Sequence, residues 1–408
     1  MHITILALGS RGDIQPYAVL GSGLRTAGHQ VRFITFENFA SLVTENDLDF
    51  HPIHGDAQAL VASGGTDILG LVRSFGSLAE GYARDLSAPE LGETDLIINQ
   101  VPAGLYGFDL AEKYGVPMVL AAVIPLARTS AFPLIGFPKL PIPGYNKITY
   151  RMGEQMAWQV FRTVINRWRK QTLKLPPIPP KGYFEKFGTR TIPIVNGFSQ
   201  HVVPRPVDWN EHIHVTGYWF PERKDWEPPN DLLSFIEAGS PPVFIGFGSM
   251  PIKDPQRTTN MILEALKQNG QRGILHMGWG GLGNQSLPNN VFKIDYAPYD
   301  WLFPRMAMAI HHGGSGTTAF GLRSGIPSCV VSFVFDQHYW GERIAALGAG
   351  PKPIRYKELT VERLAEAIRV GTGDSQIRQQ AVGLGKKIQA ENGIENALNV
   401  FEKMLKSL

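Results

Sequence analysis

The sequence predicts an α/β protein built from two doubly wound domains. Short apolar runs, typical of buried parallel strands, alternate with segments of helical spacing along most of the chain. The alternation starts again after a polar, proline-rich stretch near the middle of the chain. A chain of 408 residues is also too long for one ordinary core and suits about two domains.

The first domain is expected over residues 1–217. Residues 14–27 carry apolar side chains at helical spacing and stop at Gly28, which gives a strand, helix, strand unit with the runs on either side. The predicted strands of this domain are residues 3–8, 31–35, 96–99, 118–122 and 192–196.

Two later segments of this domain differ in composition from the rest. Residues 123–145 hold many prolines and glycines and are expected to form a long irregular excursion. Residues 145–172 combine apolar and basic side chains at helical spacing, which predicts a basic amphipathic helix. Such a helix either docks on the core of its own domain or uses its outer face to gather an acceptor or contact a membrane.

Residues 218–230 are polar and rich in proline, and we expect them to link the two domains. The second domain is expected over residues 231–389, with a helix at 254–268, and a final helix is expected within residues 390–408. The predicted strands of the second domain are residues 243–246, 273–276, 291–294, 308–311 and 328–333.

The composition excludes several classes of protein. Hydrophobic residues make up 43% and charged residues 18%, as in a folded chain, and a net charge of +3 is too small for a dedicated nucleic-acid-binding protein. The single cysteine, Cys329, excludes an internal disulfide and a cysteine-based zinc cluster. No segment is long and apolar enough to cross a bilayer, and residues 1–8 are typical of a strand and not of a signal peptide. We therefore expect a cytoplasmic protein, with residues 145–172 as its candidate membrane contact.

The most informative stretch is residues 311–318, where two histidines precede three glycines and three hydroxyl residues. It follows a predicted strand, and a helix is expected over residues 319–324. Glycines let a ligand approach the backbone, a helix N-terminus presents free N–H groups, and His312 supplies a proton or a positive charge. We interpret the stretch as a phosphate-binding turn. The alternative is a glycine-rich turn that holds a buried pair of histidines.

The turn after the first predicted strand contains Ser10, Arg11, Gly12 and Asp13. Because α/β folds bind ligands at the carboxyl ends of their strands, Asp13 is a candidate general base. It is equally a candidate for capping the helix that follows.

Two predicted strands of the second domain also end in polar turns. Ser249 follows the strand at 243–246 and either contacts phosphate or belongs to a tight turn. Asp336 and Gln337 follow the strand at 328–333. A carboxylate beside an amide suits sugar hydroxyls, although the pair alone is also typical of a surface loop.

Other motifs lack the context that their function needs. Residues 278–283 match G-x-G-x-x-G, but no helix is expected after them, which argues against a dinucleotide-binding site. The Asp-Leu-Asp at residues 47–49 has no supporting ligands, and the 11 histidines show no metal-ligand spacing. We therefore expect no metal site. No G-x-S-x-G elbow is present, which disfavours a hydrolase.

In their order along the chain, these motifs resemble those of a known family. Residues 300–305, 311–318 and 321–327, followed by Asp336 and Gln337, resemble the donor signature of the UDP-glycosyltransferases with the GT-B fold. The opening residues 9–17 and 24–29, with Phe-Gly-Ser-Met at 247–250, resemble the sterol 3-beta-glucosyltransferase branch and the related antibiotic glycosyltransferases. The resemblance is strong over residues 1–36 and 241–352 and weak over residues 55–215.

The resemblance implies two Rossmann-like domains facing across a cleft, with the acceptor in the first domain and a nucleotide sugar in the second. It also implies that the last helix returns toward the first domain. The expected reaction is an inverting, metal-independent transfer of a sugar (glucose from UDP-glucose) to a hydroxyl of a lipophilic acceptor such as a sterol, triterpenoid or polyketide. The UDP-sugar is then a co-substrate, and no cofactor is expected.

The resemblance also implies roles for matching positions. Asp13 would be the catalytic base, with a histidine nearby to orient it, and Ser10, Arg11 and Gly12 would lie in the donor loop. Asp336 and Gln337 would bind the sugar. The diphosphate would be bound by Ser249, His312, Gly314, Ser315, Gly316 and Thr317.

Two positions depart from the pattern of the plant relatives. Those relatives use a histidine as base, where this chain has Asp13. They stack the nucleobase on a tryptophan, where this chain has Tyr296, and Trp301 is an alternative stacking residue. Three alternatives stay open: a UDP-sugar 2-epimerase-like enzyme, a dinucleotide oxidoreductase, and an inactive protein that binds a nucleotide sugar or a lipid.

Overall fold

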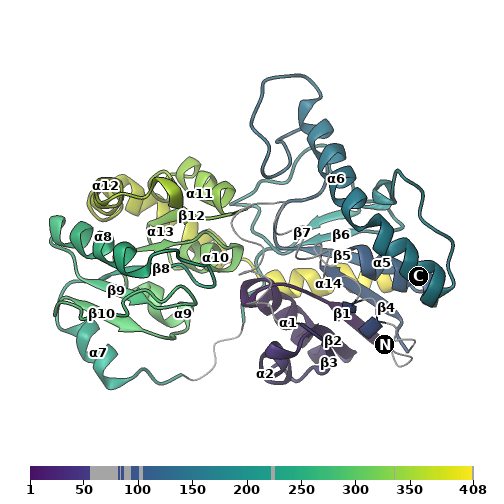
Figure 1. Ribbon diagram of the computed structural model, residues 1–408, viewed down its shortest axis with the longest axis horizontal. Helices are drawn as coiled ribbons and strands as arrows, with labels where there is room; N and C mark the ends of the chain where they lie inside the picture. Colours follow the sequence, from purple (N-terminus) through teal and green to yellow (C-terminus); the bar gives the residue numbers. More distant parts are fainter. Residues whose placement is uncertain are drawn as a thin grey trace. The chain divides into compact units, whose positions relative to one another are not determined.

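The computed structural model describes residues 1–55, 81–82, 84–86, 93–100, 104–221, 226–334 and 336–406. The chain divides into two compact units, one formed by Met1–Pro221 with Asn392–Leu408 and the other by Glu222–Glu391. Each unit contains a parallel sheet with helices packed around it (Figure 1). The predicted fold class, two doubly wound α/β domains, is confirmed.

In the described residues, the sheet of the first unit has seven parallel strands in the order β3-β2-β1-β4-β5-β6-β7. The order reverses between β1 and β4, because the chain first builds one edge and then crosses to the other side. The strands are β1 (His2–Leu6), β2 (Gln30–Phe36), β3 (Asp49–Ile53), β4 (Leu96–Gln100), β5 (Met118–Ala122), β6 (Ile194–Asn196) and β7 (Ile213–Val215).

Helices of the first unit flank this sheet (Figure 1). The C-terminal helix packs against the first helix, where a Cβ on Gly23 would lie 2.6 Å from Cγ2 of Ile394. Asn396 adds a hydrogen bond from Nδ2 to the backbone oxygen of Thr216, at 2.9 Å. The named helices are α1 (Arg11–Thr26), α2 (Ala40–Thr44), α5 (Gly104–Tyr114), α6 (Tyr145–Trp168), which continues into a π-helical turn (Arg169–Leu173), and α14 (Gly393–Leu405), with short 3₁₀ turns at Glu37–Phe39 and Phe184–Lys186.

The sheet of the second unit has six parallel strands in the described residues, in the order β10-β9-β8-β11-β12-β13, and it reverses between β8 and β11. The strands are β8 (Val243–Gly246), β9 (Gly273–His276), β10 (Val291–Ile294), β11 (Met308–His311), β12 (Ser328–Ser332) and β13 (Ile354–Arg355). The helices are α7 (Asn230–Glu237), α8 (Pro255–Gln268), α9 (Tyr299–Leu302), α10 (Ser315–Arg323), α11 (Gln337–Ala346), α12 (Val361–Gly373) and α13 (Ser375–Gln389), with 3₁₀ turns at Phe303–Arg305 and Tyr356–Glu358.

The predicted linker at 218–230 differs from the observed division of the chain. Tyr218 and Trp219 are buried in the first unit, with exposed fractions of 6% and 4%. The Trp219 ring lies edge-on to Tyr17, and its Nε1 donates to Oγ1 of Thr216 at 3.1 Å. Burial of two large aromatic side chains therefore extends the first unit to Pro221, although the sequence around them is rich in proline.

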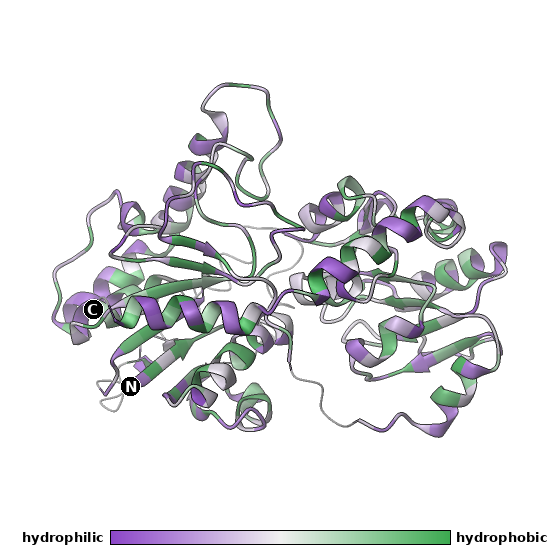
Figure 2. Cartoon of the chain, turned by 180° about the vertical axis from the view of Figure 1, so that it is seen from behind, coloured by the Kyte–Doolittle hydropathy of each residue, from purple (hydrophilic) through white to green (hydrophobic). Residues whose placement is uncertain are grey.

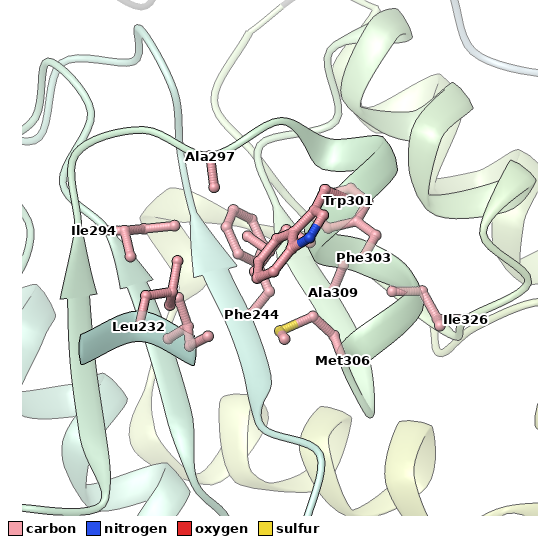
Figure 3. Close-up of a cluster of buried hydrophobic side chains, with 11 residues drawn as sticks. Leu232, Phe244, Ile294, Ala297, Trp301, Phe303, Met306, Ala309 and Ile326 are labelled. Atoms are coloured by element: carbon pink, nitrogen blue, oxygen red, sulfur yellow. The ribbon is translucent and has the colours of Figure 1, made fainter. Parts of the chain in front are cut away.

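Apolar side chains fill the interior of each unit, and Figure 2 shows hydrophobic residues concentrated in the strands. In the second unit, a core cluster lies beside β8 and β11 and includes Phe244, Ala309 and Phe303 (Figure 3). Trp301 belongs to this cluster and is 7% exposed, and the Arg305 guanidinium lies 4.3 Å from the centre of its ring. Trp301 is therefore a core residue, which removes it as an alternative for stacking a nucleobase.

Candidate active site

Asp13, Ser249 and His312 lie in turns beside the point where a sheet reverses its strand order, whereas Asp336, Gln337 and Tyr296 follow strands farther from it. In an open α/β sheet, the loops at such a reversal diverge to opposite faces and leave a ligand-binding crevice. Asp13 follows β1 at the reversal of the first unit. Ser249 and His312 follow β8 and β11, the two strands that flank the reversal of the second unit.

Asp13 is the third residue of α1, and Ser10 is the N-cap. Oδ2 of Asp13 accepts hydrogen bonds from the backbone N–H and the hydroxyl of Ser10, at 2.8 and 2.9 Å. Both hydrogen bonds that the described residues make to this carboxylate end on Oδ2, so Oδ1 is left for another partner. The expected histidine is not among these contacts: in the described parts of the chain it is Ser10 that orients Asp13.

The surroundings of Asp13 favour a base. Its side chain is partly buried, and burial raises the pKa of the carboxyl above the ordinary value, while the two bonds from Ser10 act in the opposite direction. A raised pKa makes the carboxylate a stronger base than an exposed aspartate. Arg11 and Gly12, the other predicted residues of this turn, are exposed in the first turn of α1.

Two neighbours fix the position of Asp13. Gly9 has a φ of 134°, and a Cβ there would lie 2.6 Å from Oδ2 of Asp13, so glycine is required. Gln100, at the end of β4, accepts from the backbone N–H of Leu8 at 2.6 Å and donates to the backbone oxygen of Asp13 at 3.2 Å. Gln100 was not predicted as a site residue. The available signal was the polar pair Asn99 and Gln100 at the end of a strand that begins with three apolar residues.

The glycine-rich turn of the second unit leads into α10 earlier than expected. The helix begins at Ser315, not at residue 319, and Gly314 is its N-cap. The backbone N–H of Thr318 donates to Gly314 at 2.9 Å. The N–H groups of Ser315, Gly316 and Thr317 therefore belong to the first turn, where an α-helix offers no acceptor. Small and hydroxyl-bearing residues suit a helix N-terminus, which explains the earlier start.

The two histidines before this helix have different roles. His311 is fully buried, and its Nδ1 accepts from the backbone N–H of Gly313 at 3.1 Å. Burial, with a smaller contribution from His312, lowers the pKa of His311 to about 3, so it is a neutral structural group. His312 is partly buried, and burial together with nearby His276 lowers its pKa to about 4. Without a ligand, His312 is therefore an uncharged imidazole at neutral pH.

Three turns of the second unit meet around His312. A Cβ on Gly248 would lie 3.1 Å from Cε1 of His312, which places the turn containing Ser249 against the imidazole. A Cβ on Gly313 would lie 2.8 Å from the backbone oxygen of Gln337, which places the turn after β12 on the other side. The predicted diphosphate-binding and sugar-binding residues of this unit are thus brought close together, whereas Tyr296, the predicted nucleobase-binding residue, lies apart from them.

Asp336 and Gln337 have different surroundings. Oδ2 of Asp336 accepts from Nε1 of Trp340 at 2.9 Å, and the residue is partly exposed at the start of α11. Gln337 is only 4% exposed. Its Oε1 accepts from the N–H groups of Phe333 and Val334 at 2.7 and 3.0 Å, and its Nε2 lies 3.0 Å from Sδ of Met250. Gln337 therefore holds the turn after β12 against the turn after β8.

Tyr296 follows β10, the edge strand on the far side of β9 and β8 from His312, and its side chain is 57% exposed. Between these positions lies the turn after β9, whose glycines match G-x-G-x-x-G but were not predicted to belong to the site. The backbone N–H of Trp279 donates to Gly248 at 2.9 Å, and the Trp279 ring is 40% exposed. This turn thus packs directly on the Ser249 turn. Gly278 and Gly280 allow this close approach, and they were the feature of the sequence that could have indicated the contact between the two turns.

The described parts of the chain contain no group of three or more histidine, cysteine, aspartate or glutamate side chains placed to hold a metal ion. Among the same residues, no helix combines the length and the apolar character needed to cross a bilayer.

Two families of glycosyltransferase domains match the chain. Residues 3–133 match the N-terminal domain of glycosyltransferase family 28, and residues 274–397 match the C-terminal domain of erythromycin biosynthesis protein CIII-like proteins. The first match contains Asp13, and the second contains His312 and Asp336.

Curated relatives extend the similarity over the whole chain. A sterol 3-beta-glucosyltransferase of Arabidopsis thaliana is 37% identical over 426 residues, which cover 99% of this chain and 68% of the relative. The chain belongs to the sterol 3-beta-glucosyltransferase family. A second Arabidopsis sterol 3-beta-glucosyltransferase is 35% identical over 100% of this chain and 66% of its own length. One from Neurospora crassa is 34% identical over 99% of this chain, which spans only 27% of that longer protein.

Solved structures support the GT-B fold for this member of the family. The glycotransferase of kitacinnamycin matches with a TM-score of 0.74 and 21% identity, covering 99% of both chains. The calicheamicin glycosyltransferase CalG4 matches with a TM-score of 0.70 and 17% identity, covering 99% of this chain and 98% of its own. The protein is thus a glycosyltransferase with two Rossmann-like domains, and the epimerase-like and non-catalytic alternatives are not favoured.

Proposed function

We propose that the protein transfers glucose from UDP-glucose to the hydroxyl of a sterol or a similar lipophilic alcohol, with inversion at the anomeric carbon. The observation that carries the proposal is the identity of 37% to a sterol 3-beta-glucosyltransferase over 99% of the chain. The polar turns at the two strand-order reversals provide residues for each half of this reaction. The donor is a co-substrate, and the reaction uses no cofactor and no metal.

Asp13 is the general base in this proposal. As the acceptor oxygen attacks the anomeric carbon, the hydroxyl proton passes to the carboxylate, and the bond between that carbon and the diphosphate oxygen breaks. The two bonds from Ser10 end on Oδ2, which leaves Oδ1 to receive the proton. The burial that raises the pKa of Asp13 also makes this transfer more favourable.

The departing UDP gains negative charge, and the turn around His312 would stabilise it. The N–H groups of Ser315, Gly316 and Thr317 point out of the first turn of α10, where the helix dipole also favours an anion. Ser249 would add a hydroxyl, His312 an N–H donor, and Gly314 close backbone approach. Asp336 would bind sugar hydroxyls, with Gln337 holding its turn, and Tyr296 would contact the nucleobase.

A matrix of nucleotide sugars and acceptors tests this function. We expect glucosylated sterol, detected by mass, from UDP-glucose with a sterol, and less product with flavonoid or polyketide acceptors. Formation of UDP and free or epimerised sugar without any dependence on an alcohol would contradict the proposal. Product with a flavonoid but not with any sterol would contradict the acceptor class alone.

We also propose that α6 contacts a membrane surface peripherally. Ile148, Met152, Met156 and Val160 are spaced four residues apart and are 51%, 49%, 58% and 39% exposed, so they form an apolar stripe along one side of the helix. Exposed basic residues flank this stripe, which suits the anionic surface of a bilayer. These are Lys147, Arg151, Arg167 and Lys170.

Vesicle sedimentation tests this contact. The protein is expected to sediment with vesicles that contain phosphatidylserine, and binding should fall at least about tenfold when Met152→Glu and Met156→Glu are combined. The matched control is Val207→Glu, because Val207 is 99% exposed in the same unit but lies outside the helix. Equal vesicle binding by the double methionine variant and by Val207→Glu would contradict the proposed membrane surface. Both variants should still transfer sugar to an acceptor dispersed in water.

A further inference from the structure

Beyond the predicted donor residues, a third histidine lies at the carboxyl edge of the second sheet. His276 ends β9, and the strand register pairs it with Gly246, which is in turn paired with His311. Three adjacent strands thus end at His276, Gly246 and His311, and His312 follows directly. Glycine in the middle position leaves no side chain between the two outer strands at this level.

The hydrogen bonding of His276 fixes its tautomer. Nε2 of His276 lies 3.0 Å from the backbone oxygen of Asp295, a group that only accepts, so Nε2 carries the proton. Nδ1 is then a bare acceptor. It is buried and has no hydrogen-bond partner among the described residues, and it lies 3.3 Å from where a Cβ on Gly246 would be. Nδ1 of His276 therefore faces β8.

His312 faces the same glycine-containing segment from the opposite side. A Cβ on Gly248 would lie 3.4 Å from Nδ1 of His312, and this nitrogen too is buried without a hydrogen-bond partner in the described parts of the chain. Several described groups surround the two rings. Phe244 and Tyr299 pack on the His276 ring, and His311 precedes His312. The backbone oxygen of Asp295 accepts the Nε2–H of His276, and the charge of the Asp295 carboxylate raises the pKa of His276.

We propose that His276 is a positioning residue of the donor site, whose Nδ1 accepts a hydrogen bond, directly or through one water, that stabilises a protonated His312 when a diphosphate is bound. This inference rests on the proposed function, since it assigns the diphosphate of a nucleotide sugar to the turn around His312. Binding of the donor then takes up a proton from solution.

The electrostatics of the site without a ligand define the starting point for this coupling. Without a ligand, burial and His276 hold the pKa of His312 at about 4, and burial lowers the pKa of His276 as well, so both rings are neutral at neutral pH. A bound diphosphate adds negative charge and raises the pKa of His312. His276 stays neutral because burial lowers its pKa more than the bond to Asp295 raises it, and its bare nitrogen can accept. His312 therefore has a higher pKa in the complex than in the free protein. Donor affinity should rise as the pH falls between these two pKa values, and it should level off below the lower one.

Calorimetric titration with UDP-glucose tests the proposal, because the diphosphate diester of this probe does not titrate near neutral pH. Measurements from about pH 5 to pH 8, in buffers of different ionisation enthalpy, give both the affinity and the number of protons taken up. We expect proton uptake in the unmodified protein and an affinity that rises by up to about tenfold per pH unit on acidification. In His312→Ala, uptake should disappear and affinity should fall.

Two variants of His276 separate the roles of its nitrogens. His276→Gln keeps a donor near Nε2 for Asp295 and removes the acceptor near Nδ1, while His276→Asn places an amide oxygen near Nδ1. In His276→Gln, we expect proton uptake to disappear and the affinity for UDP-glucose near pH 5 to fall about ten- to a hundredfold. In His276→Asn, most of the proton uptake and most of the affinity should remain. Thermal unfolding of the two variants checks that both are folded.

Several outcomes would overturn the inference. Uptake that persists in His312→Ala would assign the proton to another group, and identical behaviour of His276→Gln and His276→Asn would show that an acceptor at Nδ1 is not required. A pH-independent affinity without proton uptake in the unmodified protein would also contradict it while leaving the donor site intact. Absence of any UDP-glucose binding would instead contradict the proposed function.

Discussion

The turns after β1 and β11 occupy equivalent places in two similar sheets but carry opposite chemistry. Asp13 lies inside the first turn of α1 and is bound by its own N-cap residue, whereas His312 lies before α10, whose first-turn N–H groups have no acceptor within the helix. Burial acts on both groups, raising the pKa of the carboxyl and lowering that of the imidazole. The same strand-to-helix geometry thus suits the proposed base in one unit and the proposed anion site in the other.

A buried glutamine supports polar turns in each unit. Oε1 of Gln100, at the end of β4, accepts from the N–H of Leu8, and Oε1 of Gln337 accepts from two N–H groups after β12. Each glutamine also reaches a neighbouring turn through Nε2. An amide suits this task because it donates and accepts without changing charge as nearby groups gain or lose protons.

Removing the base should have the largest effect. Asp13→Asn keeps the size of the side chain and an oxygen for the bonds from Ser10, but it cannot take the acceptor proton. We expect kcat to fall by about 10²- to 10⁴-fold with little change in the affinity for UDP-glucose. Steady-state rates and calorimetric binding measure the two quantities. Unchanged turnover would remove Asp13 from the mechanism.

Replacing the imidazole in the other turn should affect both binding and rate. His312→Ala removes a hydrogen-bond donor to the diphosphate, and we expect kcat to fall by about 10²- to 10³-fold and the affinity for UDP to fall by about tenfold or more. Unlike Asp13→Asn, this variant should therefore be visible in a binding assay without any acceptor. Normal UDP affinity would show that the turn does not contact the diphosphate.

The motif residues in these turns were easier to predict from the sequence than the residues that hold the turns in place. Buried parallel strands are continuous apolar runs, so β8, β9, β10 and β11 were predicted with their observed ends. The edge strands β3, β7 and β13 were missed because they are short or contain polar residues and proline. Motif residues such as Asp13 and His312 stood out by type and spacing.

Residues that act only through tertiary contacts gave weaker signals. His276 and Gln100 are polar residues at strand ends, and their hydrogen-bond partners are 19 and 92 residues away in the chain, respectively. Spacing along the sequence does not show which strands are neighbours, so it could not bring His276 to His312 or Gln100 to Leu8. The partner of Asp13 was missed for the opposite reason: Ser10 is so close in sequence that it was assigned to the donor loop.

The two glutamines offer a comparison of stability. Gln337→Leu would leave the N–H groups of Phe333 and Val334 without their acceptor, and we expect it to lower the free energy of unfolding by about 2–4 kcal/mol. Gln100→Leu would leave one such group, the N–H of Leu8, without its acceptor, and it should lower the free energy of unfolding by about 1–3 kcal/mol. Chemical denaturation measures both values. A larger loss for Gln100→Leu would mean that contacts other than these backbone bonds determine the stability of the turns.

The smallest expected effect concerns the hydroxyl of Ser10. Ser10→Ala removes one of the two hydrogen bonds that lower the pKa of Asp13 and keeps the backbone bond, so the pKa should rise further. The carboxylate is the active form, and it is lost as the pH falls through this pKa. The acidic limb of the kcat/KM profile should therefore move to higher pH, with a loss of about three- to tenfold on that limb and little change well above it. A uniform loss at every pH would instead show that the hydroxyl only aligns the carboxylate, because a change in basicity cannot lower the rate where Asp13 is already fully ionised.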